Sequence, residues 1–370
     1  MTLKRKLNIS FIVLFLAFIL APLFDNIFHI SPVKNLFENR VLSGLPKNPQ
    51  TLRETSDYPR KFDNFFNDNY GFRKTLISIN SWLMDNVFNQ SPDNRAMIGK
   101  DGWLYFDNNN SLIDAQGLAK ISDRKIEIAA NSLIKNWHNL RAQNIDYLFV
   151  IAADKTSIYP EFLPDFIKVS RKNRRIDKLI KVLKNKEPNF PLIDLREILL
   201  EAKKNEVIYH KTDTHWNRRG AHYGYVEIMK KLGLDYNKRS EFRNFEDAFH
   251  VGDIAQIMNM RLGNENLDLR ANFEEKWFII KPTKEEKKDF RKAEFFSNHD
   301  ENLPVLFVYK DSFFDNMTYF MAQHFSRSYF VNEFPCDLNI DVVQKYKSNI
   351  VIQQFWEGRI EEVVNKCKIK

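Results

Sequence analysis

Apolar positions in the middle of the chain switch between two periods, and this alternation indicates the fold class. Helical spacing over 122–140 is followed by a largely apolar run over 144–153, which has the length of a strand buried on both faces. A helical pattern over 174–185, a strand pattern over 191–195 and another helical pattern over 220–232 continue the series. Strands alternating with helices are typical of an α/β fold with a largely parallel sheet. Three further strands are expected at 306–309, 329–331 and 349–355.

The first residues have the pattern of a segment that enters a membrane. Lys4, Arg5 and Lys6 precede a mostly apolar run from Leu7 to Phe24, and about twenty apolar residues span a bilayer. The basic flank favours a cytoplasmic location for this end, so the rest of the chain is directed outward. We expect a retained signal-anchor helix over 1–28. A cleaved signal peptide is the alternative, because the run is short, although no small-x-small cleavage site is clear.

A polar arm and one large domain are expected after this helix. Residues 29–60 are rich in Pro, Asn and Ser and predict a linker or extended arm. Residues 61–370 are assigned to a single domain. Near its start, aromatic residues at helical spacing over 58–88 are interpreted as core, with a break near Gly71. The stretch over about 241–299 is charged and less regular, which suggests an insertion over the strand ends.

Composition and charge narrow the classes of partner. Hydrophobic residues at 44% and charged residues at 28% are typical of a globular protein. The formal net charge of +8 favours an anionic partner such as an acidic polysaccharide or anionic lipid headgroups, with a solvated basic surface as the plainer explanation. Basic residues are not interleaved with aromatic residues as in nucleic-acid modules, so nucleic acid is disfavoured.

The sequence gives no sign of a metal or a nucleotide cofactor. The chain has 11 glycines and no GxGxxG or GxxxxGK motif. Its two cysteines, Cys336 and Cys367, belong to no CxxC or Cys/His cluster, so we expect no metal and no cofactor. From sequence alone, the two cysteines are equally compatible with a disulfide in an oxidising compartment and with two free thiols.

Asp213 and His215 have the spacing of a carboxylate–histidine pair. Side chains at positions i and i+2 of an extended or tightly looped backbone point to the same side. The Asp213 carboxylate can therefore hold one ring nitrogen of His215 and leave the other free to accept a proton. His210 is a weaker rival at the end of the preceding strand, and His222 is interpreted as structural.

Ser312 is the best candidate for the nucleophile that such a pair needs. It lies in a polar turn between the apolar run at 304–309 and a helical pattern, at a strand end where α/β proteins build their sites. The alternative is that the turn simply caps a helix. The Ser312 N–H is a candidate oxyanion donor, whereas Asn217 and Asn316 are only weak candidates for a second donor.

Three further residues are possible site-lining residues because they neighbour these positions. Lys155 follows the strand at 144–153, Trp216 adjoins His215, and Asp311 precedes Ser312. An ordinary solvated lysine is the alternative for Lys155.

Taken together, these motifs resemble the SGNH hydrolase-like domain of the alginate O-acetyltransferases of the AlgJ/AlgX type. The resemblance rests on Asp213-Thr-His215-Trp216 followed by Gly220-Ala221, and on a later strand that ends in Asp311-Ser312-Phe313. It continues in several shorter motifs over nearly everything after residue 35: Glu38-Asn-Arg40, Tyr70-Gly-Phe-Arg73, Gly99-Lys-Asp-Gly-Trp-Leu-Tyr105, Asp154-Lys155, Gly252-Asp-Ile254 and Val351-Ile-Gln-Gln-Phe355. The chain departs from the family pattern at Lys310, where members usually have a small residue, and a bulky side chain there could narrow the turn.

The resemblance implies a three-layer α/β/α domain and an activity. It implies an extracytoplasmic O-acetyltransferase of the bacterial envelope, anchored in the inner membrane and facing the periplasm. Ser312, His215 and Asp213 would be its nucleophile, base and orienting carboxylate. It further implies an alginate-like polysaccharide acceptor and a membrane-bound O-acyltransferase (MBOAT) partner that supplies acetyl. An acetylesterase with the same triad and a non-catalytic polysaccharide-binding or scaffold subunit remain alternatives.

Overall fold

The structure is a computed structural model of the 370-residue chain. It describes residues 3–31, 41–88, 90–107, 110–170, 172–245, 252–260, 268–281, 283, 290 and 292–367. The chain forms two compact units. The N-terminal unit comprises residues 1–94 and 253–262, and the main unit comprises residues 95–252 and 263–370. The motif at 38–40 lies outside the described residues.

The N-terminal unit consists of helices. Its elements are α1 (Leu3–Phe28), α2 (Leu52–Asn69), α3 (Arg73–Asn86) and α10 (Asp253–Ile257). The stretch Lys4–Phe28 is long and apolar enough to cross a membrane. Helix α2 begins inside the range expected as an arm, because the Thr51 side chain accepts the Glu54 N–H and caps it.

The break predicted near Gly71 is confirmed, because α2 ends at Asn69 and α3 begins at Arg73. A Cβ at this glycine would collide with the Pro22 carbonyl. The interpretation of the aromatic residues over 58–88 as core is wrong, because no residue of α2 is buried and in α3 only Ser81 is.

The main unit is built on a seven-stranded sheet in the order β4-β3-β11-β9-β10-β8-β7. Its parallel part comprises β3 (Asp146–Ala152), β4 (Leu192–Asp194), β9 (Val305–Tyr309), β10 (Arg327–Val331) and β11 (Ile350–Trp356). All five were predicted from the apolar runs. Two antiparallel strands were not predicted, the edge strand β7 (Trp277–Ile280) and its neighbour β8 (Ala293–Asn298), and they lie in the stretch expected to be an insertion.

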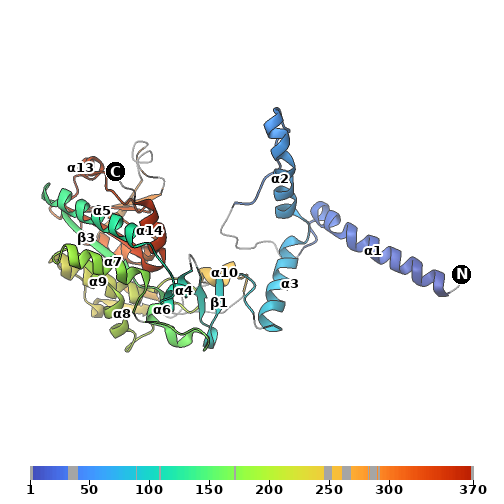
Figure 1. Ribbon diagram of the computed structural model, residues 1–370, viewed down its shortest axis with the longest axis horizontal. Coiled ribbons are helices and arrows are strands. Elements are labelled where there is room, and N and C mark those ends of the chain that lie inside the picture. Colours follow the sequence, from blue (N-terminus) through green and yellow to red (C-terminus); the bar gives the residue numbers. More distant parts are fainter. Residues whose placement is uncertain are drawn as a thin grey trace. The chain divides into compact units, whose positions relative to one another are not determined.

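Helices cover both faces of this sheet, as Figure 1 shows, so the predicted three layers are present. One face carries α5 (Asp123–Arg141), α7 (Arg175–Lys186) and α14 (Ile360–Lys366). The other carries α8 (Arg196–Ala202), α9 (Arg218–Leu232) and α12 (Asp315–Ala322). Successive residues of the central strands alternate between the two cores, which explains their continuous apolar runs.

Shorter elements connect these layers in the main unit. They are β1 (Ala96–Ile98), β2 (Leu104–Phe106), α4 (Ser111–Ala115), α6 (Lys155–Ile158), β5 (Phe242–Phe245), β6 (Asp268–Ala271) and α13 (Ile340–Lys345). Strand β1 pairs with β2, and β5 pairs with β6, each in an antiparallel two-stranded sheet. Single 3₁₀ turns occur at Lys100–Gly102, Pro160–Phe162, Arg239–Glu241, Ser312–Phe314 and Glu357–Arg359.

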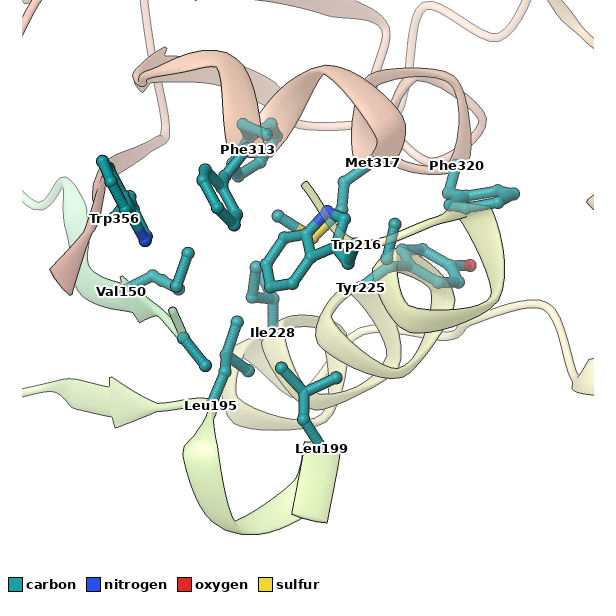
Figure 2. Packing of buried hydrophobic residues seen from close by; sticks show 14 of the residues in the cluster. Val150, Leu195, Leu199, Trp216, Tyr225, Ile228, Phe313, Met317, Phe320 and Trp356 are labelled. Atoms are coloured by element: carbon teal, nitrogen blue, oxygen red, sulfur yellow. The ribbon is translucent and has the colours of Figure 1, made fainter. Parts of the chain in front are cut away.

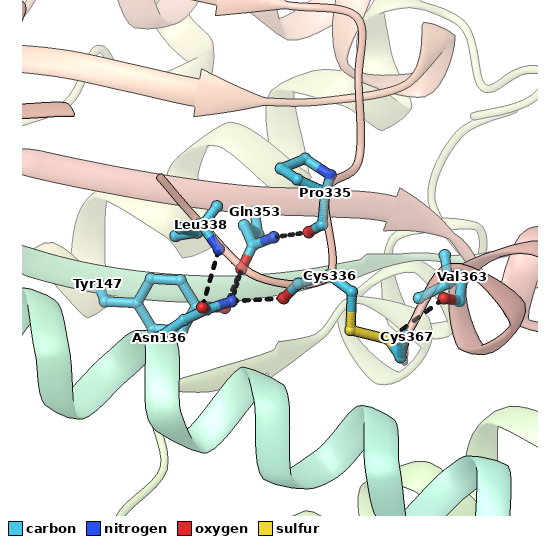
Figure 3. Close-up of a disulfide and its surroundings, with 8 residues drawn as sticks. All are labelled: Asn136, Tyr147, Pro335, Cys336, Leu338, Gln353, Val363 and Cys367. Carbon is cyan, nitrogen blue, oxygen red and sulfur yellow. Dashed lines mark hydrogen bonds between the residues drawn. A yellow bond between two sulfur atoms is a disulfide. The ribbon is translucent and has the colours of Figure 1, made fainter. Parts of the chain in front are cut away.

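A disulfide joins Cys336 to Cys367, the pairing that the sequence left open. It ties the end of α14 to the loop after β10 (Figure 3). Beside it, the Asn136 side chain of α5 donates to the Cys336 carbonyl at 2.8 Å and accepts the Leu338 N–H at 3.0 Å. The disulfide and these bonds hold the loop after β10 against the α5 face.

Candidate active site

Asp213 and His215 lie in a tight loop in front of α9. Tyr209 and Trp216 close this loop as an isolated antiparallel bridge, and the His210 N–H donates to the His215 carbonyl at 3.3 Å. One oxygen of Asp213, Oδ1, lies 2.6 Å from His215 Nδ1 and also accepts the His215 N–H at 2.9 Å. The carboxylate therefore fixes both the backbone and the ring of His215, as the i, i+2 spacing predicted.

Ser312 lies at the carboxyl end of β9, in the 3₁₀ turn that leads into α12. Its Oγ is 2.8 Å from His215 Nε2, the ring nitrogen that Asp213 leaves free. Asp213, His215 and Ser312 thus form one continuous chain of hydrogen bonds, although His215 and Ser312 are 97 residues apart in sequence. The Ser312 side is exposed and the Asp213 side is buried. This geometry lets the imidazole accept the Ser312 proton.

Asp311 lies behind the turn and not on its open side. Its Oδ1 accepts the Phe313 N–H and the Gln354 Nε2–H, each at 3.0 Å, and its Oδ2 accepts the Trp356 N–H at 2.6 Å. Burial raises the pKa of this carboxyl, and the donated hydrogen bonds oppose that rise. The sequence placed Asp311 among possible site-lining residues, whereas in the structure it connects the Ser312 turn to the end of β11.

Trp216 is fully buried beneath the site. Its ring meets Phe313 edge-on at 5.4 Å, and Phe313 also contacts the His215 ring at 4.7 Å. Trp356 stacks on Phe313 at 5.5 Å with an interplanar angle of 10°. Figure 2 shows the rings of Trp216, Phe313 and Trp356 together in the core. Phe313 therefore supports both the His215 loop and the Ser312 turn.

Lys155 supports the His215 loop from below. It is buried, with Nζ 2.9 Å from the Leu104 carbonyl and 3.2 Å from the Lys211 carbonyl. Thr212, the residue after Lys211 in the loop, is held by Gly252, whose N–H donates to Thr212 Oγ1 at 3.2 Å. A Cβ at this glycine would collide with the Thr212 backbone. Lys155 therefore supports the loop, because its ammonium group donates to two backbone carbonyls.

The two asparagines considered as second oxyanion donors are both engaged elsewhere. Asn217 caps α9 by accepting the Arg219 and Gly220 N–H groups at 3.0 Å, and its Nδ2 donates to the Val207 carbonyl at 2.8 Å. Asn316 Nδ2 donates to the Trp216 carbonyl at 2.9 Å. Asn217 is thus fully buried and serves as the cap of α9, and Asn316 ties α12 to the His215 loop.

Lys310, the departure from the family pattern, does not crowd the serine. Its backbone N–H donates to the Val331 carbonyl at 2.9 Å, and its ammonium pairs with Asp315 in the first turn of α12. The stem of the side chain is buried. The lysine is accommodated because a long side chain can bury its stem while its charge reaches a carboxylate.

Sequence reasoning missed a buried polar chain behind the Ser312 turn. The Trp356 indole N–H donates to Asp154 Oδ2 at 2.8 Å, and the Asp154 N–H donates to Glu357 Oε1 at 2.6 Å. Glu357 lies 3.8 Å from Arg174 and 3.7 Å from Arg196, and burial raises its pKa to about 7. Their positions in the sequence could have indicated them, because Asp154 and Trp356 both lie at the carboxyl ends of predicted central strands.

His222, the histidine interpreted as structural, is surrounded by packed side chains. His222 is buried in α9, its Nε2 donates to the Asn237 carbonyl at 3.1 Å, and burial lowers its pKa to about 4. The expectation that the site binds no metal stays a prediction.

Several solved structures have a fold similar to that of this chain. Bacillus cereus PatB1 with a sulfonyl adduct is similar with a TM-score of 0.52 and 17% identity, over 71% of this chain and 96% of that one. A DHHW family protein from Eubacterium siraeum is similar with a TM-score of 0.50 and 15% identity, over 74% and 99% of the two chains. The O-acetyltransferase domain of Pseudomonas putida AlgJ gives a TM-score of 0.47 and 15% identity, over 74% and 94%.

Sequence comparison supplies the family. No match is found among curated proteins. The family model described as "SGNH hydrolase-like domain, acetyltransferase AlgX" matches residues 96–292, which is more than half of the 370-residue chain and includes the Asp213–His215 loop. The resemblance seen in the sequence is thereby confirmed: the protein belongs to the AlgX family of SGNH hydrolase-like acetyltransferase domains.

Proposed function

We propose that the protein is an O-acetyltransferase that modifies an extracytoplasmic polysaccharide through an acetyl-Ser312 intermediate. The observation that carries the proposal is the hydrogen-bond chain from Asp213 through His215 to Ser312. A base held by a carboxylate and aimed at an exposed hydroxyl is the arrangement used for nucleophilic acyl transfer. Membership in a family of acetyltransferase domains supplies acetyl as the group transferred.

The first half-reaction forms the acetyl-enzyme. Ser312 Oγ attacks the carbonyl carbon of the acetyl donor, and His215 Nε2 takes the hydroxyl proton. The carbonyl oxygen becomes an oxyanion, and the Ser312 N–H at the start of the turn is the donor best placed to stabilise it. Collapse of this intermediate breaks the bond to the leaving group, which receives the proton from His215. Asp213 orients the imidazole and stabilises its charged form.

The second half-reaction returns the enzyme to its starting state. A sugar hydroxyl attacks the acetyl carbon of acetyl-Ser312 and loses its proton to His215 Nε2. Breaking the bond to Ser312 Oγ then releases the acetylated sugar, and the proton returns to the serine. The same residues serve both half-reactions because the second step is chemically the reverse of the first.

The proposed cellular setting rests on two features of the chain. The apolar helix α1 follows Lys4, Arg5 and Lys6, so the main unit would be exported while the helix stays in the inner membrane of a bacterium. The disulfide between Cys336 and Cys367 fits an oxidising compartment such as the periplasm. An acetyl donor would then arrive across the membrane, which suits an MBOAT partner, and the net charge of +8 suits an acidic, alginate-like glycan.

Acetyl-ester hydrolysis is the second candidate, and the exposure of Ser312 favours it. Water can reach an acetyl group on an exposed serine as readily as a sugar hydroxyl can. A non-catalytic binding subunit is disfavoured, because it would have no need for a His215 ring held between Asp213 and Ser312.

A partition assay separates these functions. The full chain in detergent is incubated with p-nitrophenyl acetate and oligosaccharides, either mannuronate oligomers or neutral glucans, and acetylated sugar and free acetate are both measured. We expect acetylated mannuronate oligomers with wild type and with Ser240→Ala, an exposed serine in the same unit. Neither acetylated sugar nor acetate should form above background with Ser312→Ala. Acetate release without sugar acetylation would overturn transfer in favour of hydrolysis.

A further inference from the structure

Helix α2 has an apolar face that nothing in the described N-terminal unit covers. Tyr58, Phe62, Phe65 and Phe66 follow the i, i+4, i+7, i+8 spacing that places side chains on one side of a helix. No residue of α2 is buried, and Phe62 and Phe66 are 41% and 51% exposed. The opposite side carries polar and charged residues, among them Arg53, Arg60 and Asn64. Such a helix needs an apolar environment along one side only.

Helix α3 repeats this arrangement, with its other side packed inside the unit. Ser81 is buried, and Ser78 Oγ accepts a hydrogen bond from Asn259 Nδ2 at 2.9 Å. On the outer side, Leu76, Ile79, Trp82 and Leu83 are exposed, with Trp82 at 59%. A row of large exposed apolar side chains on two successive helices exceeds the scattered apolar residues of an ordinary surface.

Both helices are fastened to the C-terminal end of α1. The Asp25 carboxylate accepts the Ser31 N–H at 2.5 Å and the Phe72 N–H at 2.6 Å. Ser31 Oγ lies 2.5 Å from Thr75 Oγ1. Together with the close approach of Gly71 to Pro22, these contacts hold the corner between α2 and α3 against the last two turns of α1.

The length of α1 determines how deep in the membrane the corner between α2 and α3 lies. Its 26 residues make a helix about 39 Å long, whereas the hydrocarbon core of a bilayer is about 30 Å thick. With Lys4, Arg5 and Lys6 on the cytoplasmic side, the last turns of α1 reach the outer headgroup region. Aromatic side chains are enriched at this level of membrane proteins, and amphipathic helices lie there parallel to the surface.

We propose that α2 and α3 lie on the outer surface of the phospholipid bilayer, with the face formed by Tyr58, Phe62, Phe65 and Phe66 and the outer side of α3 inserted among the lipids. The continuity of both helices with the membrane helix selects lipid over a second copy of the chain as the occupant of these faces. The proposal does not depend on the chemistry at Ser312.

Spin labels on the full chain test this proposal directly. Both natural cysteines are in the disulfide, so a single introduced cysteine can be labelled selectively. Phe62→Cys, Phe66→Cys and Leu76→Cys report on the apolar faces, and Asn64→Cys and Arg53→Cys are matched controls on the opposite side of α2. Each variant is reconstituted in vesicles of phosphatidylethanolamine and phosphatidylglycerol. Accessibility of the label to oxygen, which partitions into lipid, is compared with accessibility to a water-soluble nickel chelate.

We expect an oxygen-to-nickel accessibility ratio several-fold higher at the three apolar positions than at the two controls. Equal ratios on both sides of α2 would show that the face lies in water and would overturn the proposal. Labels at the apolar positions shielded from both reagents would overturn it as well, because the face would then be covered by protein, such as a second copy.

A second measurement keeps the test decisive if a cysteine variant misfolds. Trp82 lies on the outer side of α3, and Trp82→Phe preserves an aromatic ring at this position. In vesicles that contain brominated phospholipid, wild-type tryptophan emission should be quenched, and most of that quenching should be lost in Trp82→Phe. Quenching of equal size in both proteins would contradict insertion of α3.

Discussion

The His215 ring is held by a single carboxylate oxygen that also holds its own backbone. Asp213 Oδ1 accepts a hydrogen bond from the His215 N–H and lies 2.6 Å from Nδ1. One carboxylate oxygen thus holds both the backbone and the ring of His215. Nε2 is consequently directed at Ser312 Oγ and carries the lone pair that accepts its proton. The reactivity of Ser312 should therefore depend on the charge of Asp213 as well as on its position.

Asp213→Asn should preserve the loop and abolish most of the activity. An amide at this position can donate to Nδ1 and favour the wrong tautomer, so that Nε2 carries a hydrogen and cannot accept a proton from Ser312. Pre-steady-state acetylation with p-nitrophenyl acetate should slow by about 10³- to 10⁴-fold, as for the equivalent change in serine hydrolases. Asp300→Asn, an exposed carboxylate of the main unit, is the control. An unchanged rate in Asp213→Asn would exclude the orienting role.

The residues of the site differ in how far the sequence could predict them. Asp213 and His215 are neighbours in sequence, so their pairing follows from local geometry, and Ser312 was found because it follows an apolar strand. Asp154 and Trp356 are 202 residues apart, and nothing local indicates their hydrogen bond. Lys155, Trp216 and Asp311 lie next to the right elements, but the direction of each side chain depends on tertiary packing.

At the scale of elements, the nucleophile turn is fixed by its neighbour β11. Asp311 is the link, because its carboxylate accepts two backbone N–H groups, one from its own turn and one from Trp356 at the end of β11. Gln354 Nε2 donates a third bond, and Gln354 Oε1 accepts the Asp311 N–H at 3.2 Å. A buried group with this many partners leaves several donors unpaired when it is changed.

Asp311→Asn should therefore destabilise the main unit by about 1–3 kcal/mol, because a buried N–H donor would face an NH₂ group in place of an oxygen. Thermal unfolding should begin at lower temperature, and acetylation should slow because the turn is no longer held. Asp341→Asn is the matched control, since this carboxylate is exposed in the first turn of α13 and a surface charge at such a place should contribute about 1 kcal/mol or less. Similar losses of stability in the two variants would contradict the linking role of Asp311.

The elements that could be predicted are those whose pattern is set by burial on the sheet. Strands β3, β9 and β11 have both faces covered and are visible as continuous apolar runs. Strand β7 is at the sheet edge with β8 beside it, and the two carry exposed and half-exposed residues among buried ones. Their weaker pattern resembles that of the charged stretch around them. Helix α2 begins before its aromatic residues because its start is decided by the Thr51 cap.

At the scale of the whole molecule, the stability of the main unit depends on pH through one buried carboxyl group. Glu357 lies in the polar chain behind β11, where burial raises its pKa from the ordinary 4.5 to about 7. The folded protein thus holds this proton more tightly than the unfolded chain does. Stability from this group is complete below pH 4.5 and is lost as the pH rises through about 7.

Glu357→Gln should remove this contribution, because the amide does not ionise. The melting temperature of wild type minus that of the variant should therefore fall between about pH 4.5 and pH 8. The comparison isolates Glu357, because the two buried histidines with pKa values lowered to about 4 are present in both proteins. A difference that stays constant over this range would show that Glu357 has the same charge in the folded and unfolded protein.

The central claim is that Ser312 carries the acetyl group during transfer, and intact-mass analysis of the full chain tests it most directly. After brief incubation with p-nitrophenyl acetate and rapid acid quenching, wild type should gain one acetyl group that peptide mapping assigns to Ser312. Ser312→Ala should gain none, and prior treatment with a sulfonyl fluoride, which modifies activated serines, should block the site. An acetyl group on another residue, or none on a folded wild-type protein that releases p-nitrophenol, would contradict the account.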